Sequence, residues 1–422
     1  MKVLVVGSGG REHALVWKIA QSETVDKMYC APGNGGISRD VECVNIKAED
    51  IGGLIKFVKN NSIDITVVGP EIPLVNGIVD EFEKNGLKIF GPSKAAAQLE
   101  GSKAFSKKIM LKYKVPTALS EEFISSEAAM RYLEKQKYPL VVKADGLAAG
   151  KGVIICTDRD EAVRAIKTIM EDKVFGDSGA KIIIEEYLNG EEVSVLAFSD
   201  GKNVIPLVPS QDHKRIFDED KGPNTGGMGA YSPLPVMNEK MLGEVKEKIL
   251  LPVVLGMEKE GILYKGILYA GLMLTKDGPK VLEFNARFGD PETQAVLPRM
   301  ESDIMEPIIG VIAGDISRCV IKWKTDACVC VVIASGGYPD RYEKGFEISG
   351  LNDVEDAVVF HAGTILEDGN ILTSGGRVLG VTALGADIQN AIDKCYSAIE
   401  KLSFKNMHYR KDIGKKAVRR VK

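Results

Sequence analysis

The sequence VLEFNARFGDPE, from Val281 to Glu292, alternates apolar and polar side chains and therefore predicts a β-strand with two unlike faces. One face is expected to join the core through Leu282, Phe284, Ala286 and Phe288. On the other face, Glu283 and Asn285 offer oxygen ligands that suit a hard cation such as Mg2+. Arg287, one step further, is placed to contact a phosphate. A solvated face of an antiparallel strand carries the same residue types, so the surrounding sequence has to distinguish the two interpretations.

The composition is that of an ordinary globular protein, with 45% hydrophobic and 27% charged residues among 422. That length predicts about two to four domains. The net charge of -4 supplies no basic field, so no nucleic-acid partner is expected. The seven cysteines form no CxxC pair, which is typical of a reduced, cytoplasmic protein. Neither a signal peptide nor an apolar run near the roughly 18 residues of a membrane span is present, so no membrane partner is expected.

The chain begins with a short apolar run, KVLVVG (Lys2–Gly7), followed by a glycine-rich turn and a helical pattern. Such a turn directs backbone N–H groups and the positive end of the helix dipole to one point, which favours a phosphate. A dinucleotide site is not expected, because Glu12 stands at the third glycine position, where its carboxylate would repel a pyrophosphate. We therefore predict a site for a single phosphate or sugar phosphate, with Arg11 as a clamp. A plain tight turn is the alternative.

Strand and helix patterns then alternate up to residue 90, which predicts a parallel α/β sheet for this first region. The strand Ile63–Val68 leads into GPE, so Glu71 is expected at the carboxyl end of the sheet, where open parallel sheets bind ligands. A helix over Leu74–Lys84 and a strand over Leu87–Phe90 complete the set.

The second region contains a basic, glycine-rich segment after the apolar strand Leu140–Val142. The segment holds two lysines and three glycines, namely Lys143, Gly146, Gly150, Lys151 and Gly152. Basic side chains beside a glycine-rich loop suit a polyphosphate. The loop is not a Walker A motif, because its spacing is one residue short and a glycine replaces the Ser or Thr that would bind Mg2+. Lys103, at the start of an earlier helix, could by itself be a surface charge.

KIIIEEYL (Lys181–Leu188) is an apolar strand that ends in acidic residues, and Asn189-Gly190 after it predicts a hairpin with the next strand. An exposed backbone edge with Glu192 nearby suits an adenine and a ribose, whereas surface glutamates on an ordinary hairpin are the alternative. DHKRIFDEDKGPNTGGMGAYSP (Asp212–Pro233) is predicted to be a long polar loop that covers a substrate.

The rest of the chain leads back to the opening strand and then to a third region. A helix is predicted over Asn238–Glu260, and Asp277-Gly278 predicts a hairpin with the opening strand. Beyond residue 325, apolar strand patterns and an amphipathic helix over Ile388–Leu402 predict a small α/β domain. The basic end, Lys415–Lys422, is predicted to be a solvated tail.

Together, these motifs resemble the ATP-grasp superfamily and, within it, the phosphoribosylamine–glycine ligase family. The resemblance covers essentially the whole chain and is carried by VVGSGGREHA (Val5–Ala14), VVGPE (Val67–Glu71), GPSKAAAQLEGSKAFSK (Gly91–Lys107), VVKADGLAAGKGV (Val141–Val153), the segment Asp212–Pro233, EFNARFGDPETQ (Glu283–Gln294) and HYRKDIG (His408–Gly414). So many ordered matches are highly specific. Ala286 stands where members often carry Cys, but it is expected to face the core, so no chemistry is put in doubt.

The resemblance implies an α/β fold of ATP-grasp architecture. An N-terminal parallel-sheet (pre-ATP-grasp) domain would span residues 1–102. A central ATP-grasp unit of two α+β subdomains would span 103–324, with ATP between the subdomains. A small C-terminal α/β cap domain would span 325–422.

The resemblance also assigns roles to individual residues. ATP would be held by Lys103, Lys143, Gly150, Lys151, Gly152, Glu185, Glu186, Tyr187, Leu188 and Glu192. Mg2+, or Mn2+, would be held by Glu283 and Asn285, and the catalytic residues would be Arg287 and Asp290. The substrates would be bound by Gly10, Arg11, Glu71, Asp212 and Glu292.

The implied reaction joins glycine to 5-phosphoribosylamine, releases ADP and phosphate, and belongs to de novo purine synthesis. The residue chemistry agrees, because phosphorylating the glycine carboxylate gives an acyl phosphate that an amine can attack. That route needs a metal, cations and positioning more than a protein nucleophile. One alternative is another ATP-grasp carboxylate–amine ligase or a carboxylase acting on bicarbonate. A second is a nicotinamide oxidoreductase or a catalytically silent nucleotide-binding module. We expect a monomer or a weak homodimer.

Overall fold

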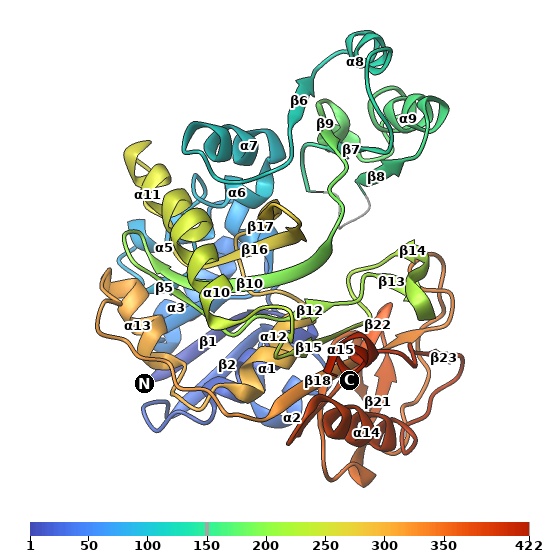
Figure 1. The fold of residues 1–422 in the computed structure, drawn as a ribbon. Helices are drawn as coiled ribbons and strands as arrows, with labels where there is room; N and C mark the ends of the chain where they lie inside the picture. The colour runs from blue at the N-terminus through green and yellow to red at the C-terminus, as the bar shows by residue number, and fades with distance from the viewer. Residues whose placement is uncertain (148–151, 422) are drawn as a thin grey trace.

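The computed structural model describes residues 1–147 and 152–421. The N-terminal part of the chain forms a five-stranded parallel sheet (Figure 1). Its order is β3-β2-β1-β4-β5. The strands are β1 (Lys2–Gly7), β2 (Lys27–Pro32), β3 (Glu42–Cys43), β4 (Ile65–Val68) and β5 (Ile89–Phe90). β4 is buried along its whole length, as expected for a strand of a parallel sheet covered on both faces. The predicted parallel sheet is confirmed.

Six helices accompany this sheet: α1 (Gly10–Ile19), α2 (Ile37–Asp40), α3 (Ile51–Asn61), α4 (Glu71–Val75), α5 (Ile78–Lys84) and α6 (Gln98–Gly101). The prediction of one helix over residues 74–84 is wrong, because α4 and α5 are separate. Gly77, between them, has a φ of 91°, a left-handed conformation that interrupts a right-handed helix. Glu71 begins α4 directly after β4, at the carboxyl end of the sheet, as predicted.

Two antiparallel sheets form the middle of the chain. The smaller, in the order β6-β9-β7-β8, contains β6 (Ser120–Phe123), β7 (Leu140–Ala144), β8 (Val153–Cys156) and β9 (Ile182–Glu186). The larger, in the order β11-β10-β16-β17, contains β10 (Glu191–Asp200), β11 (Val204–Pro206), β16 (Lys265–Thr275) and β17 (Gly278–Asn285). The smaller sheet has a hydrophobic cluster of its own and stands apart at the top of Figure 1. The two predicted α+β subdomains are therefore confirmed.

The helices of this part of the chain are α7 (Lys103–Lys112), α8 (Ser126–Leu133), α9 (Arg159–Ile166), α10 (Glu239–Val245), α11 (Leu251–Lys259), α12 (Glu292–Val296) and α13 (Met305–Ala313). Single π-helical turns, Lys167–Glu171 and Lys246–Leu250, continue α9 and α10. The helix predicted over residues 238–260 is therefore present, formed by α10, its π-helical turn and α11. No helix among residues 1–147 and 152–421 is long and apolar enough to cross a membrane.

The hairpin predicted at Asn189-Gly190 is wrong. β9 and β10 belong to different sheets, and residues 187–190 cross from one sheet to the other. A Cβ added to Gly190 would lie 2.1 Å from the carbonyl oxygen of Leu274. This glycine therefore serves a close approach of two backbones rather than a tight turn.

The alternation predicted for the opening stretch fails at Leu282. The register between β16 and β17 shifts at this residue, which makes Leu282 the extra residue of a β-bulge. Val281 takes the buried position instead, and Leu282 packs with Leu188 and Met273 in a small apolar cluster. The strand ends at Asn285, but the remaining predicted core residues are buried, namely Phe284, Ala286 and Phe288.

The C-terminal part contains a six-stranded sheet in the order β12-β15-β18-β22-β19, with β23 pairing to β18. Its strands from the end of the chain are β18 (Ala327–Ser335), β19 (Val358–His361), β22 (Arg377–Gly385) and β23 (Met407–His408). A separate hairpin, β20 (Thr364–Glu367) and β21 (Asn370–Thr373), and the helices α14 (Ile388–Ile399) and α15 (Lys415–Val421) complete this part. The predicted small α/β domain is confirmed in type, whereas the boundaries at 102 and 324 stay predictions.

The polar loop predicted over residues 212–233 is largely regular structure. It contains four short strands: β12 (Gln211–Asp212), β13 (Arg215–Phe217), β14 (Lys221–Asn224) and β15 (Gly229–Ser232). β12 and β15 join the six-stranded sheet, and β13 and β14 form a hairpin. These strands are too short to show an alternating pattern. The predicted solvated tail is also wrong in part, because α15 is a helix that places Lys416 at a cavity.

Candidate functional site

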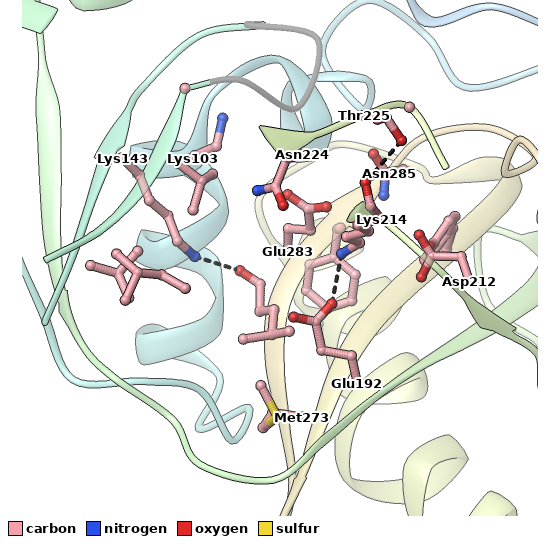
Figure 2. Close-up of a pocket in the computed structure, with 18 of the residues that line it drawn as sticks. Lys103, Lys143, Glu192, Asp212, Lys214, Asn224, Thr225, Met273, Glu283 and Asn285 are labelled. Atoms are coloured by element: carbon pink, nitrogen blue, oxygen red, sulfur yellow. Dashed lines mark hydrogen bonds and ion pairs between the residues drawn. The ribbon is translucent and has the colours of Figure 1, made fainter. Parts of the chain in front are cut away.

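A cavity of about 1310 Å³ lies where the two antiparallel sheets, the N-terminal part and the C-terminal part meet (Figure 2). Glu283 and Asn285, on the polar face of β17, line it. Lys103 of α7 and Lys143 of β7 line it from the side of the smaller sheet. The polar face of β17 is therefore directed into a cavity, and the solvated-face interpretation is wrong for this strand.

Two lysines bracket one buried carboxylate at the smaller sheet. Lys143 Nζ lies 2.8 Å from Glu185 Oε2, and Lys107 Nζ lies 3.2 Å from Glu185 Oε1. All three side chains are buried, and Lys143 Nζ also donates to the carbonyl of Leu282 at 3.1 Å. Lys143 is thus held pointing towards β17. Because a single carboxylate fixes both ammonium groups, Lys107 contributes to the placement of Lys143.

Glu283 is a carboxylate surrounded by cations. Burial opposes its ionisation, but Lys214, Lys103 and Lys143 lower its pKa below the ordinary value. Lys214 Nζ also lies 2.9 Å from Glu192 Oε2, an ion pair drawn in Figure 2. Burial opposes the charge on Lys214, but Glu192 and neighbouring carboxylates raise its pKa well above the ordinary value. Glu283 and Lys214 therefore both remain charged at neutral pH.

Arg287 is held between two carboxylates from the N-terminal side. Its Nη2 lies 2.9 Å from Glu100 Oε1, and its Nε lies 3.3 Å from Glu71 Oε2. Nη2 also donates to Asn285 Oδ1 at 3.3 Å. Glu100 additionally accepts the backbone N–H of Ala286 at 2.7 Å, so one carboxylate fixes both the guanidinium and the strand end that carries it. Burial raises the pKa of Glu100, although the charge on Arg287 opposes this.

Further carboxylates lie at the end of the cavity formed by β12 and α12. Burial, with Glu292 nearby, raises the pKa of Asp212 to about 7, although Lys214 opposes this. Tyr269 Oη donates to Glu292 Oε1 at 2.6 Å. Asp290 accepts from Gln294 Nε2 at 2.8 Å.

The glycine-rich turn before α1 is occupied by the protein itself. Glu12 Oε2 accepts the backbone N–H of Gly9 at 2.5 Å, and Glu12 Oε1 accepts from Arg11 Nε at 2.5 Å. A phosphate would therefore meet Glu12 rather than a free amide of Gly9. Arg11 Nη1 donates to the carbonyl of Phe288 at 3.0 Å and lies 4.0 Å from Glu71 Oε2, which ties this turn to the strand end.

The two predicted metal ligands fit Mg2+. Glu283 offers an ionised carboxylate and Asn285 an amide oxygen, and Mg2+ is often bound by one or two such groups together with phosphates and water. No cluster of three or more His, Cys, Asp or Glu side chains that could hold a metal occurs in the described ranges 1–147 and 152–421. The donor set therefore suits a cation shared with a substrate rather than a fully protein-enclosed ion.

Comparison with known proteins decides the family. Phosphoribosylglycinamide synthetase matches in three consecutive parts: its N domain at residues 1–100, its ATP-grasp (A) domain at 101–293 and its C domain at 328–416. The chain belongs to the phosphoribosylglycinamide synthetase family. The chain is thus an ATP-dependent ligase, which agrees with the resemblance identified in the motifs and leaves the oxidoreductase alternative unsupported.

Relatives of this synthetase family match along their full length. The phosphoribosylamine–glycine ligase of Caldanaerobacter subterraneus subsp. tengcongensis is 55% identical over 414 residues, which cover 98% of this chain and 99% of the relative. The crystal structure of the Thermotoga maritima phosphoribosylamine–glycine ligase has a TM-score of 0.86 at 34% identity, covering 98% of this chain and 100% of that one. The biotin carboxylase domain of Hydrogenobacter thermophilus 2-oxoglutarate carboxylase, solved with MgADP and bicarbonate, has a TM-score of 0.74 at 17% identity, covering 97% and 91%. This last likeness shows a shared fold alone.

The structure brings most of the predicted site residues of this synthetase to one cavity. Those that line it are Arg11, Glu71, Lys103, Lys143, Gly152, Glu185, Glu186, Tyr187, Leu188, Glu192, Asp212, Glu283, Asn285, Arg287, Asp290 and Glu292. Gly10 is not among the lining residues; a Cβ there would lie 2.6 Å from Gln294 Nε2. Gly150 and Lys151 lie outside the described residues. The role of each residue stays a prediction.

Sequence reasoning missed many of the lining residues, and four of these make ion pairs or hydrogen bonds to predicted site residues. Glu100 and Lys107 belong to the motif GPSKAAAQLEGSKAFSK, and Lys214 belongs to DHKRIF, so a signal was present for these three. Arg377 gave no signal, because it lies in none of the motifs that carry the resemblance. Its Nη1 lies 3.3 Å from Asp290 Oδ1 and donates to the carbonyl of Asp290 at 2.8 Å.

Proposed function

We propose that this chain joins glycine to 5-phosphoribosylamine at the expense of ATP, giving glycinamide ribonucleotide, ADP and phosphate in purine biosynthesis. The observation that carries the proposal is the arrangement of Lys103 and Lys143 across one cavity from Glu283 and Asn285, with Arg287 also in its lining. Cations on one side and a carboxylate–amide pair on the other match what a triphosphate and its cation need.

ATP would bind where the two antiparallel sheets meet. The crossing segment, residues 187–190, offers backbone groups to the adenine, and Leu188, Met273 and Leu282 form the apolar wall beside it. Lys103 and Lys143 would contact phosphate oxygens. Glu192 would accept ribose hydroxyls, for which it has to share its carboxylate with Lys214.

Glu283 and Asn285 would hold Mg2+, with Mn2+ as an alternative. When bound, this cation would offset negative charge on the phosphates. Arg287 would steady the phosphoryl group as it moves to the glycine carboxylate. The product of that transfer is glycyl phosphate, whose acyl carbon the amine of phosphoribosylamine then attacks, releasing phosphate.

The attacking amine has to lose a proton when the amide bond forms. Asp212 has a pKa of about 7 and lies in the same cavity, which suits a proton acceptor that works at neutral pH. Arg11, Glu71 and Asp290 would bind the sugar phosphate and its amine.

The direct test measures ADP and amide product from the purified protein with ATP and Mg2+. We expect equal amounts of ADP and glycinamide ribonucleotide only when glycine and phosphoribosylamine are both present. Bicarbonate in place of glycine is the control for a carboxylase. ADP release that depends on bicarbonate, or the absence of amide product with both substrates present, would contradict the proposal.

A further inference from the structure

A small flap from the middle of the chain borders the cavity, and the C-terminal part holds it. We define the flap as residues 215–226, which comprise β13, a 3-10 turn (Asp218–Asp220), β14 and the two residues that follow. Asp220, Asn224 and Thr225 of the flap line the cavity, and Figure 2 draws Asn224 and Thr225 around the same pocket as Glu283. The flap therefore borders the space proposed for the transferring phosphate.

The flap has little to hold its own shape. It is a two-stranded hairpin with a register irregularity, and its residues from 217 to 223 are exposed. Its tip contains Glu219 and Asp220 with φ values of 60° and 54°, a left-handed conformation that is unfavourable for residues other than glycine. Because an isolated two-stranded hairpin is marginally stable in water, contacts from outside have to maintain this conformation.

Those contacts come from HYRKDIG, whose function is otherwise unassigned. Arg410 has no exposed surface, and its Nη1 donates to Asp220 Oδ1 at 2.9 Å and to the carbonyl of Arg215 at 3.1 Å. Its Nε and Nη2 donate to the two oxygens of Asp412, each at 2.7 Å. Asp412 Oδ2 in turn accepts the backbone N–H of Glu219 at 2.9 Å. Lys416 Nζ also lies 2.6 Å from Asp220 Oδ2, and the backbone N–H of Lys411 donates to Asp218 Oδ1 at 2.8 Å. The buried guanidinium and the carboxylate of Asp412 therefore make most of the hydrogen bonds that fix the strained tip.

A second arginine holds the other end of the flap. Arg377 Nη1 donates to the carbonyl of Gly226 at 2.7 Å and to the carbonyl of Asp290 at 2.8 Å. The flap is thus fixed at its tip by Arg410 and at its base by Arg377. Both arginines belong to the C-terminal part, whereas the lysines proposed for ATP, Lys103 of α7 and Lys143 of β7, lie on other elements. Loosening the tip therefore leaves the ATP lysines in place.

We propose that Arg410 and Asp412 are positioning residues for the ligation: they hold the flap closed over the acyl phosphate so that the amine, and not water, attacks it. Arg410 itself is not among the residues that line the cavity, so it acts through the flap. The inference rests on the proposed function, because water exclusion matters only where a hydrolysable intermediate forms.

The variants Arg410→Lys and Asp412→Asn test this proposal against a matched control, Tyr396→Phe. Lysine at position 410 keeps the charge but cannot make the paired hydrogen bonds of a guanidinium. Asparagine at position 412 removes the charge of the carboxylate that accepts those hydrogen bonds. Tyr396 Oη donates to the carbonyl of Arg410 and accepts the N–H of Ile413, so the control disturbs the same segment without touching the flap.

Two measurements are made on each full-length protein. The first is the ratio of ADP to amide product with both substrates present. We expect it to rise about tenfold in Arg410→Lys, because hydrolysis competes with ligation, while the KM for ATP stays within about twofold. The second is hydrogen exchange of the flap amides, which we expect to be about tenfold to a hundredfold faster in Arg410→Lys. The control should keep both the ratio and the flap exchange of the unmodified protein.

The two measurements separate the possible failures. If flap exchange in Arg410→Lys and Asp412→Asn equals that of the unmodified protein, Arg410 and Asp412 do not position the flap. If the flap loosens but ADP and product remain equal, the flap does not protect the intermediate, and the proposal is overturned. If Arg410→Lys does not fold, Asp412→Asn decides the question alone. An unmodified protein that makes no amide product refutes the proposed function, and the exchange comparison still tests the positioning.

Discussion

Replacing Arg287 with methionine should destabilise the protein, because Glu100 loses the cation with which it pairs. Arg287 is the cation nearest the buried carboxylate of Glu100, at 2.9 Å. Glu100 is 8% exposed, and burial already raises its pKa. Without the guanidinium, Glu100 keeps the backbone N–H of Ala286 as a donor but loses its neutralising charge. Arg287→Met therefore creates an uncompensated buried charge.

The expected magnitude follows from the distance. At 2.9 Å and an effective dielectric constant of about 20, Coulomb's law gives a gross attraction of about 6 kcal/mol. Desolvation offsets part of this, and removing one partner of a buried ion pair typically costs about 3–5 kcal/mol. We therefore expect the free energy of unfolding of Arg287→Met to fall by about 3–5 kcal/mol. Adding Glu100→Gln should restore about 2 kcal/mol, because the amide oxygen still accepts from Ala286 but carries no charge.

The assay is urea unfolding of the unmodified protein, the two single variants and the double variant, with turnover measured on each. Turnover of Arg287→Met should fall about a hundredfold, and the double variant should remain as inactive although it is more stable. Arg287→Lys serves as a charge-conserving comparison. If the double variant is no more stable than Arg287→Met, the unpaired Glu100 is not the cause of the instability. Normal turnover in Arg287→Met would remove the catalytic assignment.

Three further predictions concern the metal, ATP and pH. Glu283→Gln and Asn285→Ala should each lower turnover by about tenfold or more in protein that still folds; normal turnover in both would remove the metal assignment. Lys107→Met should raise the KM for ATP about tenfold, because Glu185, which pairs with both Lys107 and Lys143, then holds Lys143 less firmly. As a control, Lys108→Met at an exposed position of the same helix should leave the KM unchanged. Burial lowers the pKa of His213 from 6.5 to about 3, so its contribution to stability is lost as the pH falls from 6.5 towards 3. His213→Leu should flatten that decline by up to about 1.4 kcal/mol per pH unit, and an unaltered slope in urea unfolding would contradict the assignment.

The parallel sheet and the hairpin carrying Glu283 were predictable because their signals are local. β1 contains the uninterrupted apolar run Val3–Val6, and β16 and β17 are joined at Asp277-Gly278 by a turn that the sequence predicts. The lining residues on these elements followed from their positions at strand ends. Local patterns therefore sufficed to place Glu71 directly after β4, and Glu283 and Asn285 on the polar face of β17.

The remaining features depend on contacts between distant segments. Asn189-Gly190 is a strong signal for a hairpin turn, but no hairpin forms there. Gly190 is instead required because its backbone lies close to the backbone of Leu274. Because of the bulge, Leu282 lines the cavity and Val281 occupies the core position. Both residues are apolar, so the sequence pattern does not reveal this shift. Glu100 and Arg377 become site residues only through partners nearly two hundred and about ninety positions away along the chain. No local pattern encodes such pairings.

The six-stranded sheet has a practical consequence for protein engineering. Because β12 and β15 hydrogen-bond alongside β18, the hydrogen bonding of the C-terminal part begins more than a hundred residues before Ala327. In a chimera that joins this chain up to residue 325 to the C-terminal part of a relative, the relative's β18 would have to pair with β15 of this chain. Exchanging the C-terminal part between relatives should therefore succeed only when residues 211–232 are exchanged together with it.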